Sequence, residues 1–568
     1  MPDAPVQSNR DKVADKAGAA ARQPTSPIHE LLDTVVYVAV LVIILKTFVA
    51  EAYDIPTGSM ATSLLGLHRE VTCEKCGYGI LVNYRESEEW RGTSGRLAVC
   101  PNCRHTQPVP PRVYGGDKVL VAKTHYALTE PARMDVIVFM FPQEPTDPDY
   151  RPKNYIKRLW GLPGEKLSIW YGDLYLRTGG GGGDERRDII RKPAAKMLEM
   201  RRIVYDDDYR PRDLADVPRW LDEGPGQGWQ PSPDGKGYQV RANEQPRWLR
   251  YRHLLRVPTG TLREQLESLE QLLRADRFAA AHQRQETEEQ ARHVRELLLE
   301  AERIARQPQL VTDFLDYNAG DGEQGFVNWV SDLMVECEVE VSRLDGEFYL
   351  ELVSGADRHQ VRFDLRTGRC RVQSWRHNHV LTQSPEAATG ISSIGRHRVR
   401  FANFDARLTV WVDRRLPFGD GWDYAPPSEQ DRGPCVADLR PVAIGARNTE
   451  VTVRHVQVWR DIYYTRTPYP PEMFDGRTPP VDLARLLSLS EEELRALKND
   501  PLAKPEKWER CRGLQPMDYE VGPDQYFALG DNSPLSRDSR DWGLVPRHLL
   551  LGKAAVVYWP LDRWKRIR

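Results

Sequence analysis

A serine and a lysine are the first residues of this sequence that could carry out a reaction together. Ser59 follows the turn-forming residues Pro56 and Gly58, so it could stand on a tight turn. Lys157 lies in an apolar, strand-like segment, where burial would lower the pKa of its ammonium from about 10.4 towards values at which the amine accepts a proton. A serine hydroxyl needs such a base before it can attack a carbonyl. The pair therefore indicates nucleophilic catalysis, although either residue alone would be an ordinary turn or surface residue.

Attack by a serine creates an oxyanion, which needs hydrogen-bond donors beside it. The amide of Ser59 and the hydroxyl of Thr57 are close enough in the sequence to act as two such donors. We expect this chemistry to need no metal ion and no organic cofactor.

Four segments in a fixed order must bring these residues together. They read Ile55-Pro56-x-Gly58-Ser59-Met60, Gly116-Asp117-x-Val119-Leu120-Val121-x-Lys123, Lys157-Arg158-x-x-Gly161-Leu162-Pro163-Gly164, and Gly530-Asp531-Asn532-Ser533 through to Asp541-Trp542-Gly543. In this order, and after an apolar segment, they resemble the type I signal peptidase family. The resemblance implies a membrane-anchored serine endopeptidase of mainly β fold, which removes signal peptides from exported preproteins after small residues at positions −1 and −3. It covers roughly residues 31–72, 113–177 and 520–562, which is under half of the chain.

The resemblance also implies roles for single residues. The family's catalytic and supporting positions fall on the nucleophile Ser59, the general base Lys157, the oxyanion donor Thr57, the lysine-orienting Ser536, and the supporting residues Gly530, Asp538 and Arg540. Its substrate-binding positions fall on Ile55, Pro56, Met60, Leu64, Tyr155 and Ile156. The sequence departs from the family pattern after Met60, where Ala61-Thr62-Ser63-Leu64 replaces a residue followed by Pro, Thr and Leu. This departure removes no reactive group.

An apolar run precedes the first motif. It extends from Val35 to Ala50 with one charge, Lys46, and with its flanks it is long enough for about 30 Å of helix. We expect a transmembrane helix over 28–51, a disordered cytoplasmic tail over 1–27, and an exoplasmic catalytic domain in the cell membrane. The alternatives are a cleaved signal peptide and a buried helix, but a signal peptide should begin nearer to residue 1.

Two pairs of cysteines lie between the first two motifs. Cys73 and Cys76 form one C-x-x-C pair, and Cys100 and Cys103 form the other. This spacing is typical of a Cys₄ zinc ribbon. We predict a structural zinc ion, with disulfides in an oxidising compartment as the alternative.

The remainder of the chain is unusual for the family. Five glycines over 179–183 mark a joint, leucines at helical spacing predict helices over 261–306, and apolar residues alternate in short runs from 328 to 459. The alternation resembles concanavalin-like jelly rolls and predicts an antiparallel β-sandwich. A carbohydrate or a protein is the expected class of ligand for this sandwich.

These features predict a mainly β protein: a signal-peptidase-like β core after one transmembrane helix, with an inserted sandwich and a helical segment. The predicted units are the tail 1–27, the membrane helix 28–51, the first catalytic part 52–177 with a zinc-ribbon-like insert over 73–103, a linker and helical insert over 178–325, the sandwich 326–465, a connector 466–519, and the second catalytic part 520–568.

The charge balance excludes one class of function. With 80 Lys and Arg against 82 Asp and Glu, the chain has no basic field that would favour nucleic acid. Two other readings remain: a membrane-tethered carbohydrate or cell-wall binding protein with an inactive peptidase scaffold, and a self-cleaving Ser-Lys repressor. The complete set of catalytic residues argues against the former, and the membrane segment argues against the latter.

Overall fold

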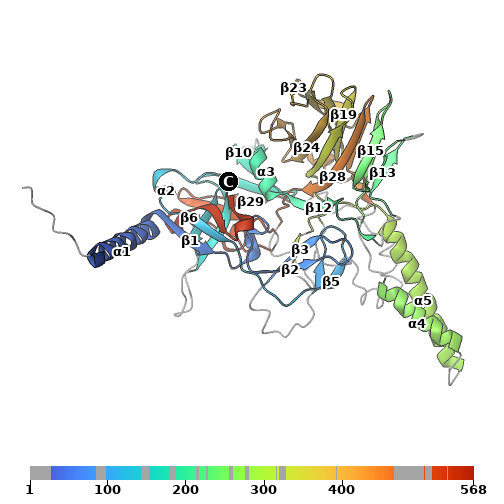
Figure 1. Cartoon of the computed structure of the whole chain (residues 1–568), viewed down its shortest axis with the longest axis horizontal. Coiled ribbons are helices and arrows are strands. Elements are labelled where there is room, and N and C mark those ends of the chain that lie inside the picture. Colours follow the sequence, from blue (N-terminus) through green and yellow to red (C-terminus); the bar gives the residue numbers. More distant parts are fainter. Residues whose placement is uncertain are drawn as a thin grey trace, which may run out of the picture.

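The structure is a computed structural model, which describes residues 27–84, 97–142, 153–179, 186–212, 217–224, 228–254, 260–275, 281–314, 316–318, 328–391, 393–465, 504–505, 515–533 and 535–567. Figure 1 shows a central sheet that contains β1 and β6, a sandwich at the upper right, and a small unit with β2, β3 and β5 below. Almost all of the predicted tail and most of the predicted connector over 466–519 lie outside the described residues.

Strands dominate the described chain, which confirms the prediction of a mainly β fold. The central sheet is antiparallel and has the order β1-β6-β32-β7-β8-β30-β31. Its strands are β1 (Ala50–Asp54), β6 (Lys118–Ala122), β32 (Leu550–Trp559), β7 (Val136–Met140), β8 (Asn154–Gly161), β30 (Gln525–Leu529) and β31 (Val545–Pro546), and β33 (Lys565–Arg566) pairs with β32. Strands from the two ends of the catalytic region therefore share one sheet.

Two strands of this sheet are buried in different ways. In β6 alternate residues are buried, with Val119 and Val121 in the core. In β8 every residue from Ile156 to Gly161 is buried, as expected for a strand whose two faces are both covered. Lys157 therefore lies in a strand whose two faces are both shielded from water.

A smaller sheet extends the catalytic core. Its order is β11-β10-β9-β29, formed by β11 (Arg186–Ile189), β10 (Asp173–Thr178), β9 (Lys166–Trp170) and β29 (Met517–Glu520). Short helices connect these regions: α2 (His125–Leu128), α3 (Ala194–Met200) and α8 (Ser539–Trp542).

The insert forms two antiparallel sheets that face one another. One contains β14 (Gln230–Pro231), β15 (Gly237–Arg241), β28 (Glu450–Arg460), β18 (Leu333–Val341), β24 (Gly395–Phe404), β25 (Arg407–Val412) and β26 (Trp422–Asp423), with β12 (Arg202–Asp206) also on β28. The other contains β13 (Trp220–Glu223), β16 (Arg247–Tyr251), β27 (Val442–Arg447), β19 (Glu347–Ser354), β20 (Asp357–Asp364), β21 (Arg369–Arg376) and β22 (His379–Gln383), with β23 (Ala387–Ala388) on β21. Residues of both sheets, such as Val335 and Leu350, lie in one hydrophobic core.

The sandwich begins earlier in the chain than the predicted boundary at residue 326. β13, β15 and β16 lie in the segment that the sequence assigns to a linker, yet β15 pairs with β28 and β16 pairs with β27. These strands are short, and only a few of their residues are apolar. Their partners lie about two hundred residues further on, so local periodicity does not reveal the pairing.

Helices occupy much of the segment predicted to be helical over 261–306. α4 (Gly260–Ala275) and α5 (Ala281–Arg306) both lie there, and the Arg295 guanidinium is 2.6 Å from a Glu270 carboxylate oxygen across the pair. Figure 1 shows the two helices extending away from the sandwich.

The apolar segment near the N-terminus forms α1 (Pro27–Ile44), followed by a single π-helical turn over Leu45–Val49 and then by β1. The prediction of a transmembrane helix over 28–51 is not confirmed. Among the described residues, no helix has both the length and the apolar character needed to cross a bilayer.

The cysteine-containing region folds into a small unit of its own. β2 (His68–Thr72) pairs with β3 (Gly79–Asn83), and β4 (Leu97–Val99) pairs with β5 (Thr106–Pro108). β17 (Tyr317–Asn318), a strand from the insert, adds to β3 in parallel. The insert is therefore in direct contact with the region between the first two motifs.

Candidate active site

Ser59 lies in a short 3₁₀ helix, Gly58–Met60, directly after the exposed Thr57. The turn is closed by a hydrogen bond from the Ala61 amide to the Gly58 carbonyl oxygen at 3.0 Å. Ser59 is half-buried, whereas Gly58 and Met60 are buried. The first amides of such a turn have no acceptor within the helix. They are therefore available to an oxyanion at this position.

Lys157 reaches Ser59 from β8. Its Nζ lies 2.6 Å from the Ser59 Oγ, although the two residues are 98 positions apart. The amine also donates a hydrogen bond to the Ile156 carbonyl oxygen at 3.0 Å. The Lys157 amine therefore has two oxygen contacts, one of which is the Ser59 hydroxyl.

The surroundings of Lys157 favour its neutral form. The residue is only 2% exposed. Burial lowers the pKa of the ammonium to about 8, although the negative charges of Asp538 and Asp531 act in the opposite direction. At pH 7 a pKa of 8 leaves about 9% of the amines neutral, against about 0.03% for a pKa of 10.5. Burial therefore favours the neutral amine, which is the form that can accept a proton.

Ser536 and Gly530 lie against the Ser59 turn. A methyl group at Gly530 would lie 2.0 Å from the Ser536 Oγ and 2.5 Å from the Ser59 carbonyl oxygen. Ser536 is fully buried, and its hydroxyl has no hydrogen-bond partner in the described part of the chain. The structure thus brings Ser536 to the site but without the expected hydrogen bond to Lys157, which goes to Ile156 instead.

Asp538 and Arg540 form a buried ion pair behind the site. The Arg540 Nη2 lies 2.7 Å from an Asp538 carboxylate oxygen, and Asp538 also accepts a hydrogen bond from the Gly530 amide at 2.9 Å. Arg540 further donates to the Ser533 hydroxyl at 2.8 Å. This network links Gly530, Ser533, Asp538 and Arg540 behind the Ser59 turn.

Asn532 is a supporting residue to which the sequence analysis assigned no role. Its side-chain amide donates to the Gly58 carbonyl oxygen at 2.9 Å, and its backbone amide donates to the Ser59 carbonyl oxygen at 3.0 Å. The one feature of the sequence that could have indicated this role is the position of Asn532 inside the motif Gly530-Asp531-Asn532-Ser533.

Arg158 and Asp531 form a second supporting pair that the sequence analysis did not single out. Both side chains are fully buried, and the Arg158 Nη2 lies 2.6 Å from the Asp531 Oδ2. Burial by itself would raise the pKa of Asp531, but the Arg158 charge and its hydrogen bonds hold that pKa below its usual value. The pair connects β8, next to Lys157, with the loop that carries Asn532.

The predicted substrate-binding residues divide into two groups. Ile55, Met60, Leu64 and Ile156 lie in one hydrophobic cluster with Val119, Val121, Val136, Val138, Ala554, Val557 and Ile567. Met60 and Leu64 are at most 1% exposed and Ile156 is 9% exposed, so Ile156 is the member nearest to the surface. Tyr155 instead packs against a second cluster, where its ring stacks on Phe141, and Pro56 is exposed.

The four paired cysteines converge in the small unit formed by β2 to β5. The Cys73 and Cys103 sulfurs lie 3.6 Å apart, as do those of Cys76 and Cys100, and all four sulfurs lie within 4.8 Å of one another. Tetrahedral zinc with Zn–S bonds of about 2.3 Å would separate its sulfurs by about 3.8 Å, whereas a disulfide requires about 2.0 Å. The cysteines are free thiols in this structure, and their arrangement fits a tetrahedral metal ion.

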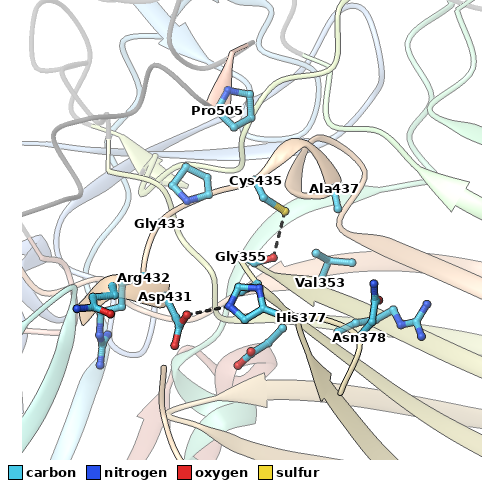
Figure 2. Close-up of a pocket in the computed structure, with 15 residues that line it drawn as sticks. Val353, Gly355, His377, Asn378, Asp431, Arg432, Gly433, Cys435, Ala437 and Pro505 are labelled. Carbon is cyan, nitrogen blue, oxygen red and sulfur yellow. Dashed lines mark hydrogen bonds and ion pairs between the residues drawn. The ribbon is translucent and has the colours of Figure 1, made fainter. Parts of the chain in front are cut away.

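A separate pocket of about 610 Å³ lies at one end of the sandwich and is lined by residues of 353–358, 377–378 and 430–437 and by Pro505. Figure 2 shows His377 facing Asp431, at 2.8 Å, and the Cys435 sulfur pointing to the Gly355 carbonyl oxygen. Burial raises the pKa of the Cys435 thiol to about 11, so the thiolate is scarce at neutral pH. The pocket therefore presents polar groups but no activated nucleophile.

Comparison with known proteins gives matches to one family. The model of the family described as "Signal peptidase, peptidase S26" matches residues 96–198 and 482–559. The matched ranges include Lys157 and Ser536 but begin after Ser59.

Individual relatives match shorter stretches. A probable signal peptidase I-2 of Synechocystis sp. is 37% identical over 86 residues, which are 14% of this chain and 39% of the relative. A signal peptidase I of Leptolyngbya laminosa is 32% identical over 103 residues, 17% of this chain and 51% of the relative. The chain thus spans about half or less of the length of these relatives.

Among solved structures, a carbohydrate binding module (CBM66) of Bacillus subtilis matches 43% of this chain and 96% of its own, with 8% identity and a TM-score of 0.22. A TM-score of this size supports no conclusion about the sandwich or its ligand. The family model and the curated relatives agree with one another, and over the matched segments the chain is similar to signal peptidases of family S26.

Proposed function

We propose that the protein is a serine endopeptidase of the signal peptidase type, in which Ser59 is the nucleophile and Lys157 is the general base. The observation that carries the proposal is the 2.6 Å separation of the Lys157 Nζ and the Ser59 Oγ, together with the burial that lowers the pKa of the lysine to about 8. A buried amine beside a hydroxyl on a turn has the geometry that nucleophilic catalysis requires.

The reaction proceeds in two halves. The neutral Lys157 amine takes the Ser59 proton as the Ser59 Oγ attacks the scissile carbonyl carbon, and the negative charge moves to the carbonyl oxygen. The Ser59 amide and the Thr57 hydroxyl are the donors for that oxyanion. The C–N bond then breaks, and the Lys157 ammonium gives its proton to the departing amine. Water attacks the resulting ester with Lys157 again acting as base, which releases the acid and regenerates Ser59.

Specificity for small residues follows from the apolar floor of the site. Ile156 is the least buried member of a cluster whose other members lie deeper, so the surface available to a substrate is shallow. A large side chain at −1 or −3 would clash with this surface, and a charged one would lose its hydration. The preferred substrates are preproteins with small residues at these two positions.

We further propose that α1 attaches the enzyme to a lipid bilayer, with the N-terminus cytoplasmic and the catalytic domain exoplasmic. Val35, Val36, Tyr37 and Ile43 of this helix are between 56% and 68% exposed. Such a contiguous apolar surface calls for an apolar partner. Flotation with liposomes tests this proposal: the parent protein should float with the lipid, and a variant without residues 27–49 should stay in the soluble fraction.

The four paired cysteines are proposed to hold one structural zinc ion. A closed Cys₄ set leaves no open coordination position for a substrate. When bound, the ion would stabilise the fold of the small unit around β2 to β5 and would take no part in proteolysis.

The pocket of the sandwich favours a second, additional function, which is binding of a polar ligand such as a carbohydrate. His377, Asp431 and Arg358 line this pocket of about 610 Å³ and offer both hydrogen-bond donors and hydrogen-bond acceptors. Calorimetric titration with N-acetylglucosamine oligomers tests the proposal, because an Asp431→Ala variant should lose the heat of binding while proteolysis stays unchanged. Absence of binding to the parent protein would reject this ligand class.

Cleavage of a preprotein by the full-length protein in detergent tests the proteolytic function. Ser59→Ala and Lys157→Ala should each abolish cleavage, and Lys157→Arg should do so as well because a guanidinium stays protonated. Unchanged cleavage by any of these variants would reject the assigned mechanism.

A further inference from the structure

The turn that carries Ser59 is in contact with residues from the inserted part of the chain. We call residues 57–64 the nucleophile loop. Arg202, the first residue of β12, and Tyr317, in β17, both reach this loop from segments that lie between the two catalytic halves. Both side chains are at most 1% exposed. Their contacts show that the insert packs against the catalytic machinery itself.

Arg202 connects the nucleophile loop to the loop that carries Asn532. Its guanidinium donates to the Ala61 carbonyl oxygen and to the Thr62 hydroxyl, each at 2.6 Å. It also donates to the Asp531 carbonyl oxygen at 2.6 Å. A planar guanidinium can serve three acceptors from one fixed position, whereas a lysine ammonium on its flexible stem cannot reproduce that arrangement.

Tyr317 packs against the residue that precedes the nucleophile. A methyl group at Gly58 would lie 2.3 Å from a ring carbon of Tyr317, so the ring lies directly over the glycine. The Tyr317 hydroxyl donates to the Leu67 carbonyl oxygen at 3.2 Å, and the ring shares a hydrophobic cluster with Ala61 and Leu65. The ring therefore packs against the nucleophile loop at Gly58 and Ala61.

The strand that carries Arg202 is also held by the cysteine-containing unit. At the far end of β12, the Asn102 side chain accepts from the Asp206 amide at 2.7 Å and donates to the Tyr209 carbonyl oxygen at 2.7 Å. Asn102 lies between Cys100 and Cys103. The cysteine unit therefore binds one end of β12, and Arg202, at the other end of this strand, binds the nucleophile loop.

Residues of the cysteine unit and of the sandwich also contact Phe314, shortly before Tyr317. The Arg104 guanidinium, one residue after Cys103, lies over the Phe314 ring at 3.7 Å. Arg460 of β28 donates to the Phe314 carbonyl oxygen at 2.6 Å. The cysteine unit and the sandwich thus together fix the approach of Tyr317 to Gly58.

We propose that Arg202 and Tyr317 are positioning residues for catalysis, through which the insert holds the Ser59 hydroxyl at the Lys157 amine. The inference rests on the proposed proteolytic function and assigns the insert a part in it. Reaction rates are sensitive to displacement of the reacting atoms by as little as about 1 Å. Release of the nucleophile loop should therefore lower turnover without changing the surface that binds substrate.

The experiment compares full-length variants in detergent with the parent enzyme on one preprotein. Arg202→Met removes all three hydrogen bonds, Arg202→Lys keeps the charge but removes the planar fork, and Thr62→Val removes one acceptor from the catalytic side alone. Arg250→Met is the matched control, because Arg250 pairs with Glu223 and Glu351 inside the sandwich. The measurements are kcat and KM per active site, counted by burst titration, and the pH profile of kcat/KM.

We expect Arg202→Met to lower kcat by about 10- to 100-fold with KM changed less than about twofold. Arg202→Lys and Thr62→Val should each lower kcat by about three- to tenfold, and their effects should not add because the two side chains share one contact. The acid limb of the pH profile should move to higher pH in Arg202→Met, since a loosened loop admits water to Lys157. Arg250→Met should leave all three quantities unchanged.

Two results would overturn the inference. One is a kcat per active site in Arg202→Lys and Thr62→Val that equals the parent value, and the other is an equal fall in Arg250→Met. If Arg202→Met fails to fold, these two milder variants still decide the outcome. Failure of the proposed function is seen separately, because it would appear as cleavage by Ser59→Ala or Lys157→Ala.

Discussion

The backbone amide of Asn532 donates a hydrogen bond to the carbonyl oxygen of Ser59 at 3.0 Å. The side chain of the same asparagine binds the Gly58 carbonyl oxygen, 474 positions away in the chain. One residue from the last part of the chain therefore binds the carbonyl oxygens of both peptide groups that flank Ser59.

Asn532→Ala should lower both turnover and stability. The substitution removes the side-chain donor of the Gly58 carbonyl oxygen, which keeps its hydrogen bond from the Ala61 amide. The loss of one hydrogen bond should lower the free energy of unfolding by about 0.5–1.5 kcal/mol. We expect kcat to fall by about tenfold as the Ser59 turn loosens. Gln360→Ala is the control, because the Gln360 amide donates to Glu351 within the sandwich. Equal kinetics for the two variants would argue against a role for Asn532.

Gly530→Ala should inactivate the enzyme. The new methyl group would lie 2.5 Å from the Ser59 carbonyl oxygen, so Gly530 and the Ser59 turn must move apart. We expect a loss of at least about 100-fold in kcat/KM. Gly115→Ala is the control, because a methyl group there meets nothing within 4 Å. A fully active Gly530→Ala enzyme would show that the two loops do not pack this closely in solution.

The activity should rise with pH and level off above about pH 8. The reaction needs the neutral amine of Lys157, whose pKa burial lowers to about 8, so kcat/KM should fall about tenfold for each pH unit below that value. Asp538→Asn should move this limb to lower pH, because the Asp538 charge raises the pKa of Lys157. The pH profiles of the parent and the variant give both results. A limb that stays in place or moves upwards would contradict the assignment.

The same shift predicts how stability depends on pH. The unfolded chain keeps the Lys157 proton up to about pH 10.5, whereas the folded protein loses it near pH 8. Between these values the unfolded state binds more protons, so the contribution of Lys157 to the free energy of unfolding rises with pH. Denaturant titrations of the parent and Lys157→Met at pH 7.5 and pH 9.5 should show this rise in the parent alone.

Removal of one cysteine ligand should release the metal ion. We expect about one zinc ion per chain in the purified parent and none in Cys73→Ser, with a lower melting temperature because the small unit loses its central cross-link. Metal analysis and thermal unfolding check this outcome. Cys435→Ser is the control, because Cys435 lies in the sandwich pocket and not in the cysteine cluster. A parent protein without zinc would contradict the prediction.

Local patterns predicted much of the architecture. The apolar runs around 118–122, 135–139, 526–529 and 554–559 correspond to strands β6, β7, β30 and β32. Helices α4 and α5 occupy much of the leucine-rich segment. These elements bury one face or both faces with a regular period, and such a period is visible in a short stretch of sequence.

Other features depend on partners that are far away in the chain. The strands β15 and β16 pair with β28 and β27, respectively, about two hundred residues later, and nothing within the short strands themselves indicates this. The backbone of Ile156, and not the Ser536 hydroxyl, is also the hydrogen-bond partner of Lys157 beside Ser59.

By itself, the sequence determined which reactive groups are present and in which order: a serine on a turn, a lysine in an apolar strand, and two pairs of cysteines at metal-ligand spacing. Residue type and spacing suffice for these statements because they are properties of single segments. Only the tertiary structure decided that the hydroxyl and the amine lie 2.6 Å apart and that Arg202 binds the nucleophile loop. Distances, burial and pKa shifts arise from packing between distant segments, which no local pattern contains.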